Sequence, residues 1–350
     1  MPKTVLSLLL SIYLIPSFST ESSSQTLYRI VVDGKRGFID SSGHVVVQPE
    51  FEFARGYSDR LALVWSGTSS EMTDKTPDSW GYVDMHGNTR LRPKYDDGRP
   101  FSEGLAAVRK NGVGTITNTV WGFIDTAGRQ VVKPQYYSVG DFSEGLAWVQ
   151  TQRRIFLVYD KDLFGYIDST GKMVIKPEFE QAGNFSEGLA PVRVNGKRGY
   201  IDRSGLIAIR LTYDAGFGFS NGRAQVRIGT KWGYIDRTGE LRIPAEYDNG
   251  LSFSEGFALV LRSGQWAFID TNGTLLRAPP FSSASLFSGG LAPVLLNGRW
   301  GYIDRTGNLV LPAAYDSAGS FFQGRALVSI AGREEYIDKS GRVVWASREP

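Results

Sequence analysis

The chain has 350 residues, of which 41% are hydrophobic and 21% charged, an ordinary balance for a soluble globular protein. Its formal net charge of +3 is small, which gives no reason to expect nucleic acid or an anionic membrane surface as a partner. The absence of cysteine excludes disulfides, thiolate nucleophiles and cysteine zinc sites. Abundant aromatic residues and 41 glycines favour many short strands joined by turns.

Residues 1–19 differ from the rest of the chain. Lys3 supplies a positive charge, residues 5–15 form an apolar run, and residues 17–19 form a small-x-small cleavage pattern. The apolar run is too short to span a bilayer, so the segment is predicted to be a secretory signal peptide rather than a transmembrane anchor. We therefore expect export to the periplasm, the cell surface or the medium, with no stable membrane span after signal removal.

Residues 20–350 are predicted to form a single array of nine tandem repeats. An aromatic-Gly-aromatic-Ile-Asp run, with minor variations, recurs throughout this region. The aspartates that end these runs are Asp40, Asp84, Asp125, Asp168, Asp202, Asp236, Asp270, Asp304 and Asp338. Their spacing is 44, 41 and 43 residues and then 34 residues five times, and such a fixed period indicates a repeat architecture.

Each unit of about 34 residues is predicted to be a three-stranded meander. In one copy, residues 189–194 form the first strand, Asn195 and Gly196 form a two-residue turn, and the run ending at Asp202 forms the second strand. An Asp-x-x-Gly turn follows, in which the carboxylate accepts N–H groups two or three residues on and glycine supplies a positive φ. A short third strand then ends near a proline in most copies.

Three insertions lengthen the first three intervals, and all fall in the loop between the first and second strands. They span residues 66–79, 110–120 and 151–163 and are expected to emerge side by side on one edge of the array. Insertions on one face of a repeat protein often form its binding face, although neutral loop drift is the alternative. The candidate partner contacts at this edge are Trp65, Arg153, Arg154, Phe156 and Tyr159.

The run from Lys231 to Gly239, KWGYIDRTG, is followed by Ile-Pro-x-x-Tyr-Asp and Phe-Ser-Glu-Gly. This pattern resembles the bacterial WG repeat family, and the resemblance covers essentially the whole of residues 20–350. It implies an all-β tandem repeat, found often in exported or surface proteins, and no shared catalytic activity. The local departures are Arg36 and Arg198 at the Trp position, Ala267 at the Gly position, and Glu334 with Glu335 in the last unit.

The sequence offers no strong catalytic, cofactor or metal motif. His44 and His86 lie in predicted turns, where side chains are generally solvated, so metal binding is not expected there. The recurring acids are better explained by a backbone role that every copy needs than by glycosidase chemistry; these are the turn aspartates and Glu103, Glu144, Glu187 and Glu255. The recurring tryptophans are predicted to pack between units; these are Trp80, Trp121, Trp232, Trp266 and Trp300.

Two all-β architectures satisfy the pattern, an open β-solenoid or superhelical array and a closed β-propeller-like ring. The open array is favoured because no strand is split between the termini and because Arg36, Glu334 and Glu335 place charges in the end units, as caps would. The expected function is non-catalytic: an exported binding or scaffold protein that contacts a protein or glycan of the cell envelope through one edge. The alternatives are a carbohydrate-active or glycan-binding protein that uses the repeat aromatics and acids, and a structural spacer. The oligomeric state is left open.

Overall fold

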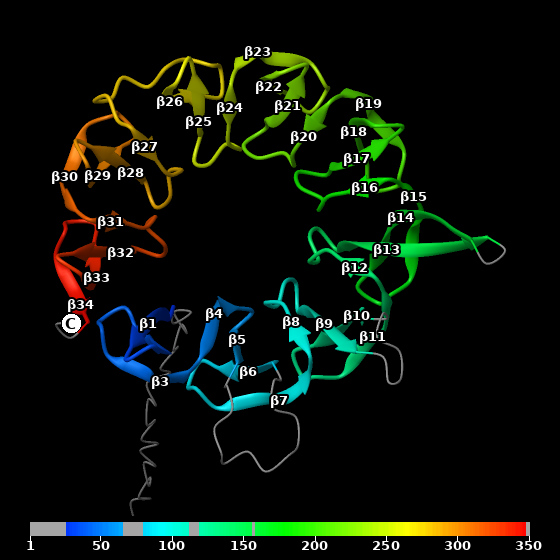
Figure 1. The fold of residues 1–350 in the computed structure, drawn as a ribbon, viewed down its shortest axis with the longest axis horizontal. Coiled ribbons are helices and arrows are strands. Elements are labelled where there is room, and N and C mark those ends of the chain that lie inside the picture. The colour runs from blue at the N-terminus through cyan, green and yellow to red at the C-terminus, as the bar shows by residue number, and fades with distance from the viewer. Residues whose placement is uncertain (1–25, 66–79, 112–118, 156–157, 348–350) are drawn as a thin grey trace, which may run out of the picture.

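The computed structural model describes residues 26–65, 80–111, 119–155 and 158–347. In Figure 1 the strands of these residues form a ring of small sheets, and the last sheet lies beside the first. The described residues make nine sheets of three or four antiparallel strands, each from one continuous stretch of chain, which is a nine-bladed β-propeller. None of the described residues belongs to a helix with the length and apolar character needed to cross a membrane.

The blades are numbered here in chain order. Blade 1 contains β1 (Tyr28–Val32), β2 (Lys35–Ile39) and β3 (Val45–Phe51). Blade 2 contains β4 (Phe53–Ser58), β5 (Leu61–Trp65), β6 (Trp80–Asp84) and β7 (Thr89–Tyr95). Blade 3 contains β8 (Asp97–Gly98), β9 (Leu105–Asn111), β10 (Thr119–Asp125) and β11 (Gln130–Tyr136). Blade 4 contains β12 (Ser138–Val139), β13 (Leu146–Ile155), β14 (Val158–Asp168) and β15 (Met173–Phe179).

The remaining blades follow the same order. Blade 5 contains β16 (Gln181–Ala182), β17 (Ala190–Val194), β18 (Lys197–Ile201) and β19 (Ile207–Tyr213). Blade 6 contains β20 (Ala215–Gly216), β21 (Ala224–Ile228), β22 (Lys231–Ile235) and β23 (Leu241–Tyr247), and blade 7 contains β24 (Asn249–Gly250), β25 (Phe257–Arg262) and β26 (Gln265–Asp270). Blade 8 contains β27 (Ser283–Ala284), β28 (Leu291–Leu296), β29 (Arg299–Asp304) and β30 (Leu309–Tyr315). Blade 9 contains β31 (Ser317–Ala318), β32 (Arg325–Ile330), β33 (Arg333–Asp338) and β34 (Val343–Ala346).

The ring is closed, so the predicted open array is wrong and the closed ring named as its alternative is right. Blade 9 contacts blade 1 directly: the hydroxyl of Tyr336 donates to the backbone oxygen of Arg29 at 2.7 Å. The rings of Tyr28 and Tyr336 lie 5.6 Å apart. Arg325 Nη2 also donates to the backbone oxygen of Ser41 at 2.7 Å. The two ends of the repeat array therefore form a seam.

Side chains close this seam in the way that they join neighbouring blades elsewhere, without an exchanged strand. Within the ring, Arg223 Nε donates to the backbone oxygen of Thr271, the counterpart of the contact from Arg325 to Ser41. The charges that suggested caps have another explanation. The Trp position is only half-buried, and Arg36 occupies it in blade 1 while donating to the backbone oxygens of Gly34 and Glu52.

Most blades have a fourth strand that the predicted three-stranded meander lacks. This innermost strand lies at the edge of the blade that faces the centre of the ring, within the connection expected to be a loop, and in blades 3 to 9 it is two residues long (Figure 1). In blade 6, for example, β20 pairs with β21 through Ala215 and Arg227. A strand of two residues is too short to show a periodic pattern, so it could not be predicted from the sequence.

The inter-blade core is built from the tyrosine of each Trp-Gly-Tyr run and a phenylalanine of the following blade. The ring of Tyr234 packs edge-on against Phe253 at 5.0 Å, and its hydroxyl donates to the backbone oxygen of Leu251 at 2.8 Å. A buried tyrosine thus fills space with its ring and satisfies its polar end. The repeat tryptophans, by contrast, stay half-buried at the rim of this core.

The glycine of each Trp-Gly-Tyr run is required by the outer strand. A Cβ atom on Gly233 would lie 2.6 Å from the backbone oxygen of Ile243 and 2.7 Å from the backbone nitrogen of Ala245. Blade 7 has Ala267 at this position and lacks the outer strand among its described residues. The departure at Ala267 therefore coincides with the loss of a regular outer strand.

Candidate functional site

The recurring aspartates hold the turn that follows the Trp-Gly-Tyr strand of each blade. In blade 6, Asp236 Oδ1 accepts the backbone N–H groups of Thr238 at 2.9 Å and Glu240 at 3.1 Å. The same pair of bonds occurs in all nine blades. The donating N–H groups belong to the residues two and four positions after the aspartate. The sequence predicted donors two or three positions on, so only the donor at the second position was predicted correctly.

These bonds make the turns sensitive to acid. The hydroxyl of Ser340, with the backbone N–H groups of Ser340 and Arg342, outweighs the effect of burial and lowers the pKa of Asp338 to about 2. Because the folded pKa is below the unfolded value of about 3.9, the ionised Asp338 stabilises the protein above about pH 4, and this contribution is lost as the pH falls toward 2. Asp338→Asn should therefore be less stable than the wild type in urea at pH 7, with the difference shrinking toward pH 2.5. An equal difference at both pH values would contradict this assignment.

The recurring glutamates link one blade to the next. Glu103 sits at a positive φ, and its carboxylate accepts the backbone N–H groups of Glu144 at 2.7 Å and Gly145 at 2.8 Å. Equivalent bonds from the other members also cross a blade junction; these members are Glu144, Glu187 and Glu255. Both classes of recurring acid thus bind backbone, as expected from their presence at constant positions.

The two histidines lie in exposed turns. His44 Nδ1 is 2.9 Å from Ser42 Oγ, and His86 Nδ1 is 4.0 Å from Asp84 Oδ1. No group of three or more His, Cys, Asp or Glu side chains that could hold a metal ion occurs within the described ranges.

The predicted contact residues belong to two separate blades. Trp65 ends β5 in blade 2, where its ring lies 6.4 Å from the ring of Trp80. Arg153 and Arg154 lie in β13, and Tyr159 lies in β14, opposite Arg154 in the strand register. The described part of residues 151–163 thus continues β13 and β14 as a hairpin that reaches beyond the outline of the ring in Figure 1, where a loop was expected. Phe156 and most of the other two insertions lie outside the described residues.

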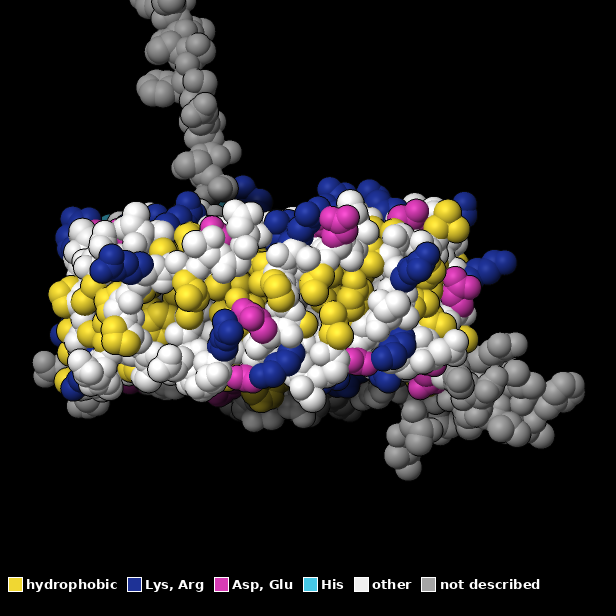
Figure 2. Space-filling model, turned by 90° about the horizontal axis from the view of Figure 1, so that it is seen from above, with side chains coloured by type: hydrophobic (Ala, Val, Ile, Leu, Met, Phe, Trp, Pro, Cys, Tyr) yellow, Lys and Arg dark blue, Asp and Glu magenta, His cyan; other side chains and the backbone are white. Residues whose placement is uncertain are grey.

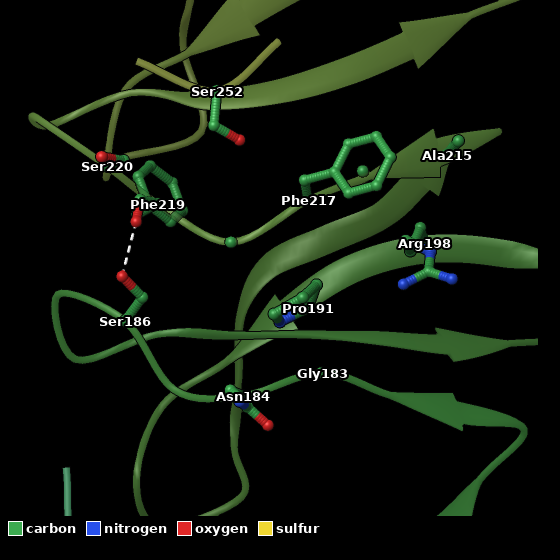
Figure 3. Close-up of a pocket in the computed structure, with 12 residues that line it drawn as sticks. Gly183, Asn184, Ser186, Pro191, Arg198, Ala215, Phe217, Phe219, Ser220 and Ser252 are labelled. Atoms are coloured by element: carbon green, nitrogen blue, oxygen red, sulfur yellow. Dashed lines mark hydrogen bonds between the residues drawn. The ribbon is translucent and has the colours of Figure 1, made fainter. Parts of the chain in front are cut away.

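A cavity of 520 Å³ lies between the inner parts of blades 5 and 6 (Figure 3). Its walls come from the inner connections of the two blades and from blade 7. The lining residues are Gly183, Asn184, Ser186, Pro191, Arg198, Ala215, Gly216, Phe217, Gly218, Phe219, Ser220 and Ser252. The volume is within the range of small-ligand sites in proteins. In the sequence, the feature that points to this cavity is Arg198, which stands where most repeats have tryptophan.

Arg198 lies at one end of this cavity without a carboxylate partner. Its guanidinium donates to Gln181 Oε1, and no described carboxylate approaches within ion-pair distance. Nearby cations are paired: Arg193 with Glu180 at 3.8 Å and Lys197 with Asp214 at 2.6 Å. Burial lowers the pKa of Arg198, although an arginine remains charged at neutral pH. Its half-buried charge is therefore available to an anionic or polar ligand.

Phe217 supplies the aromatic part of the cavity. Its side chain is 52% exposed, and its ring stacks on Trp232 at 5.7 Å with an interplanar angle of 26°. The guanidinium of Arg227 lies 5.7 Å from the Trp232 ring on the same blade. In Figure 3, Phe217 and Arg198 both border the open space between the two blades. A cation and a supported aromatic ring are thus presented together, which suits recognition of a ligand with polar and flat surfaces.

The fold and its repeating contacts define a β-propeller built from tandem repeats. Eight segments match the family described as WG containing repeat: residues 37–64, 80–113, 121–152, 164–197, 199–232, 232–266, 266–300 and 300–333. These segments cover most of the sequence, and the chain belongs to this family. No curated protein matches the sequence significantly.

The chain is similar to several solved structures at low sequence identity. A crystal structure of a eukaryotic initiation factor matches with a TM-score of 0.61 and 12% identity, covering 93% of this chain and 96% of that one. Apo AztD from Citrobacter koseri gives a TM-score of 0.41 at 10% identity, covering 92% and 94%. Puromycin hydrolase gives 0.40 at 12% identity, covering 89% and 56%. Because the identity is only 12%, the match to the initiation factor shows a similar fold and carries no information about function.

Proposed function

We propose that this protein is a non-catalytic binding or scaffold module that acts outside the cytoplasm. It holds a protein or glycan partner at the cavity between blades 5 and 6. The observation that carries this proposal is the half-buried Arg198, without a carboxylate partner, beside the exposed ring of Phe217. The signal-like pattern of residues 1–19 supports export.

The geometry of the acids favours binding over catalysis. A general acid or base needs a carboxyl group that can reach the reacting atoms. Here Asp236 and its counterparts accept backbone N–H groups, and so do Glu103 and its counterparts. The carboxylates that recur in the repeats are therefore engaged in the structure of the ring.

The edge with the insertions remains a second predicted contact region. It includes Trp65 and the hairpin that carries Arg153, Arg154 and Tyr159, together with Phe156. A partner that spans blades 4 to 6 would contact this hairpin and the cavity together. Deleting residues 66–79, 110–120 and 151–163 should then weaken retention of the partner, and unchanged retention would exclude this edge.

The main test uses the protein without residues 1–19 as bait for extracts of the native cell envelope. Arg198→Trp restores the residue that most copies carry, and Phe217→Ala removes the aromatic wall. Each should reduce retention of the principal partner by about tenfold or more, because Arg198→Trp removes the charge of the site and Phe217→Ala removes its aromatic ring. Arg262→Gln, which removes an exposed ion pair to Glu246, is the matched control and should retain the partner. Equal retention by all four proteins would refute the cavity as the binding site.

A carbohydrate-active or glycan-binding protein is the second candidate, favoured by the supported Phe217 ring, since sugars stack on aromatic faces. Incubating the purified protein with envelope glycans separates the two cases. Retention without product release supports a glycan-binding module, and release of shortened glycans supports an enzyme. Neither retention nor release would remove this candidate and leave a protein partner.

A further inference from the structure

The junction between blades 8 and 9 lacks a carboxylate that most other junctions contain. Between blades 7 and 8, Glu255 accepts the backbone N–H groups of Gly289 at 2.7 Å and Gly290 at 2.8 Å. Arg305 Nη2 donates to the same carboxylate at 2.7 Å. Two amides and one cation thus form a small carboxylate-binding site, and the preceding blade fills it.

At the next junction the carboxylate is missing but its partners are kept. Gly289 stands where blades 3, 4, 5 and 7 carry a glutamate and blade 6 carries Asn221, so the sequence reads Phe-Ser-Gly-Gly instead of Phe-Ser-Glu-Gly. The following turn contains Gln323 and Gly324, both at positive φ, the same backbone form as the occupied turns. No oxygen of the described side chains accepts the N–H groups of Gln323 and Gly324, in contrast to Gly289 and Gly290.

A cation also remains at this junction. Lys339 occupies the repeat position of Arg305, directly after the turn aspartate. A Cβ atom added to Gly289 would lie 3.7 Å from Lys339 Nζ, so the ammonium group lies beside the missing side chain. Lys339 forms no ion pair with any carboxylate of the described residues.

A cavity of 540 Å³ is lined by Gly289, Gly290 and Lys339 among others. The carboxylates on its wall are already engaged. Glu255 binds Arg305 and two amides, and Asp304 accepts the N–H groups of Thr306 and Asn308. Their negative charge is therefore partly compensated, and Lys339 is left to attract an anion.

We propose that the junction of blades 8 and 9 binds a carboxylate of a partner polypeptide, either an Asp or Glu side chain or a free C-terminus. The incoming group accepts the N–H groups of Gln323 and Gly324 and pairs with Lys339. Phe322, on the same turn, is 60% exposed and offers an apolar contact beside the carboxylate. This contact favours a peptide over a simple anion. The inference does not depend on the cavity between blades 5 and 6.

The test follows the backbone amides of Gln323 and Gly324 by NMR during titration with sodium acetate, with sodium chloride as the ionic-strength control. Two short peptides follow, one with a free C-terminus and one amidated with an internal Glu, to distinguish the two sources of carboxylate. Saturable shifts of both amides are expected with acetate and with at least one peptide. No acetate-specific shift of these amides would overturn the proposal.

Two variants form a matched pair. Gly289→Glu supplies the missing carboxylate in the backbone form that Glu255 already adopts, so it should raise the melting temperature and weaken acetate binding at least tenfold. Glu187→Gly should lower the melting temperature and create a new acetate site. It removes the carboxylate that accepts the N–H group of Gly222, where Arg237 is the neighbouring cation. If Gly289→Glu binds acetate as tightly as the wild type, the carboxylate does not bind at this junction.

Discussion

Gly233→Ala is expected to lower the free energy of unfolding by about 3 kcal/mol, a large effect for one methyl group. The new Cβ would lie 2.6 Å from the backbone oxygen of Ile243 and 2.7 Å from the backbone nitrogen of Ala245. Both atoms belong to the backbone of β23, so no side chain can rotate to make room. The outer strand must move away, as the missing outer strand of blade 7 illustrates beside Ala267.

Urea unfolding at pH 7 measures this change, and blade 7 offers the control. Ala267→Gly replaces the alanine of the blade that has no outer strand, so it should change stability only slightly. A small cost for Gly233→Ala would mean that the glycine is not needed for close approach of the outer strand. The repeat motif would then need another explanation.

Ile30→Ala should cost about 3 kcal/mol, because a closed ring buries this residue between the first and last blades. Ile30 is 2% exposed and belongs to a cluster with Tyr28, Ile39 and Tyr336. In an open array the same face of blade 1 would be a free end, and removing part of an exposed aliphatic side chain would have little effect. This substitution therefore measures closure of the ring in solution.

Leu206→Ala is the matched control, since Leu206 is 69% exposed and should tolerate truncation. Chemical unfolding of both variants gives the comparison directly. Similar small costs for the two variants would show that blades 1 and 9 separate in solution.

The repeat period and the three longer strands could be predicted because each copy repeats the same physical requirements. The Asp of the turn, the Tyr of the core and the glycine of the Trp-Gly-Tyr run all occur at constant spacing. The innermost strand was missed because a pair such as Ala215 and Gly216 has no recognisable period. Ring closure was also missed, since it depends on the accumulated rotation between blades, which no single repeat reveals.

The candidate sites were only partly accessible from the sequence. Arg198 was noticed as a departure from the repeat, but the cavity beside it depends on residues from three blades. The loss of a glutamate at Gly289 was visible, yet its meaning required the contact of Glu255 with the next blade. Positions that differ between copies are informative only after the constant contacts are known.

The repeat segments of the family are offset from the blades of the ring. Each matched segment begins in one blade and ends in the next; residues 232–266, for example, run from β22 in blade 6 to β26 in blade 7. The polypeptide therefore acts as a covalent tie across every described junction except that between blade 9 and blade 1. At that junction, the contacts between described residues come from side chains such as Tyr336 and Arg325. We therefore expect the seam to be the junction where the ring opens first under mechanical or thermal load.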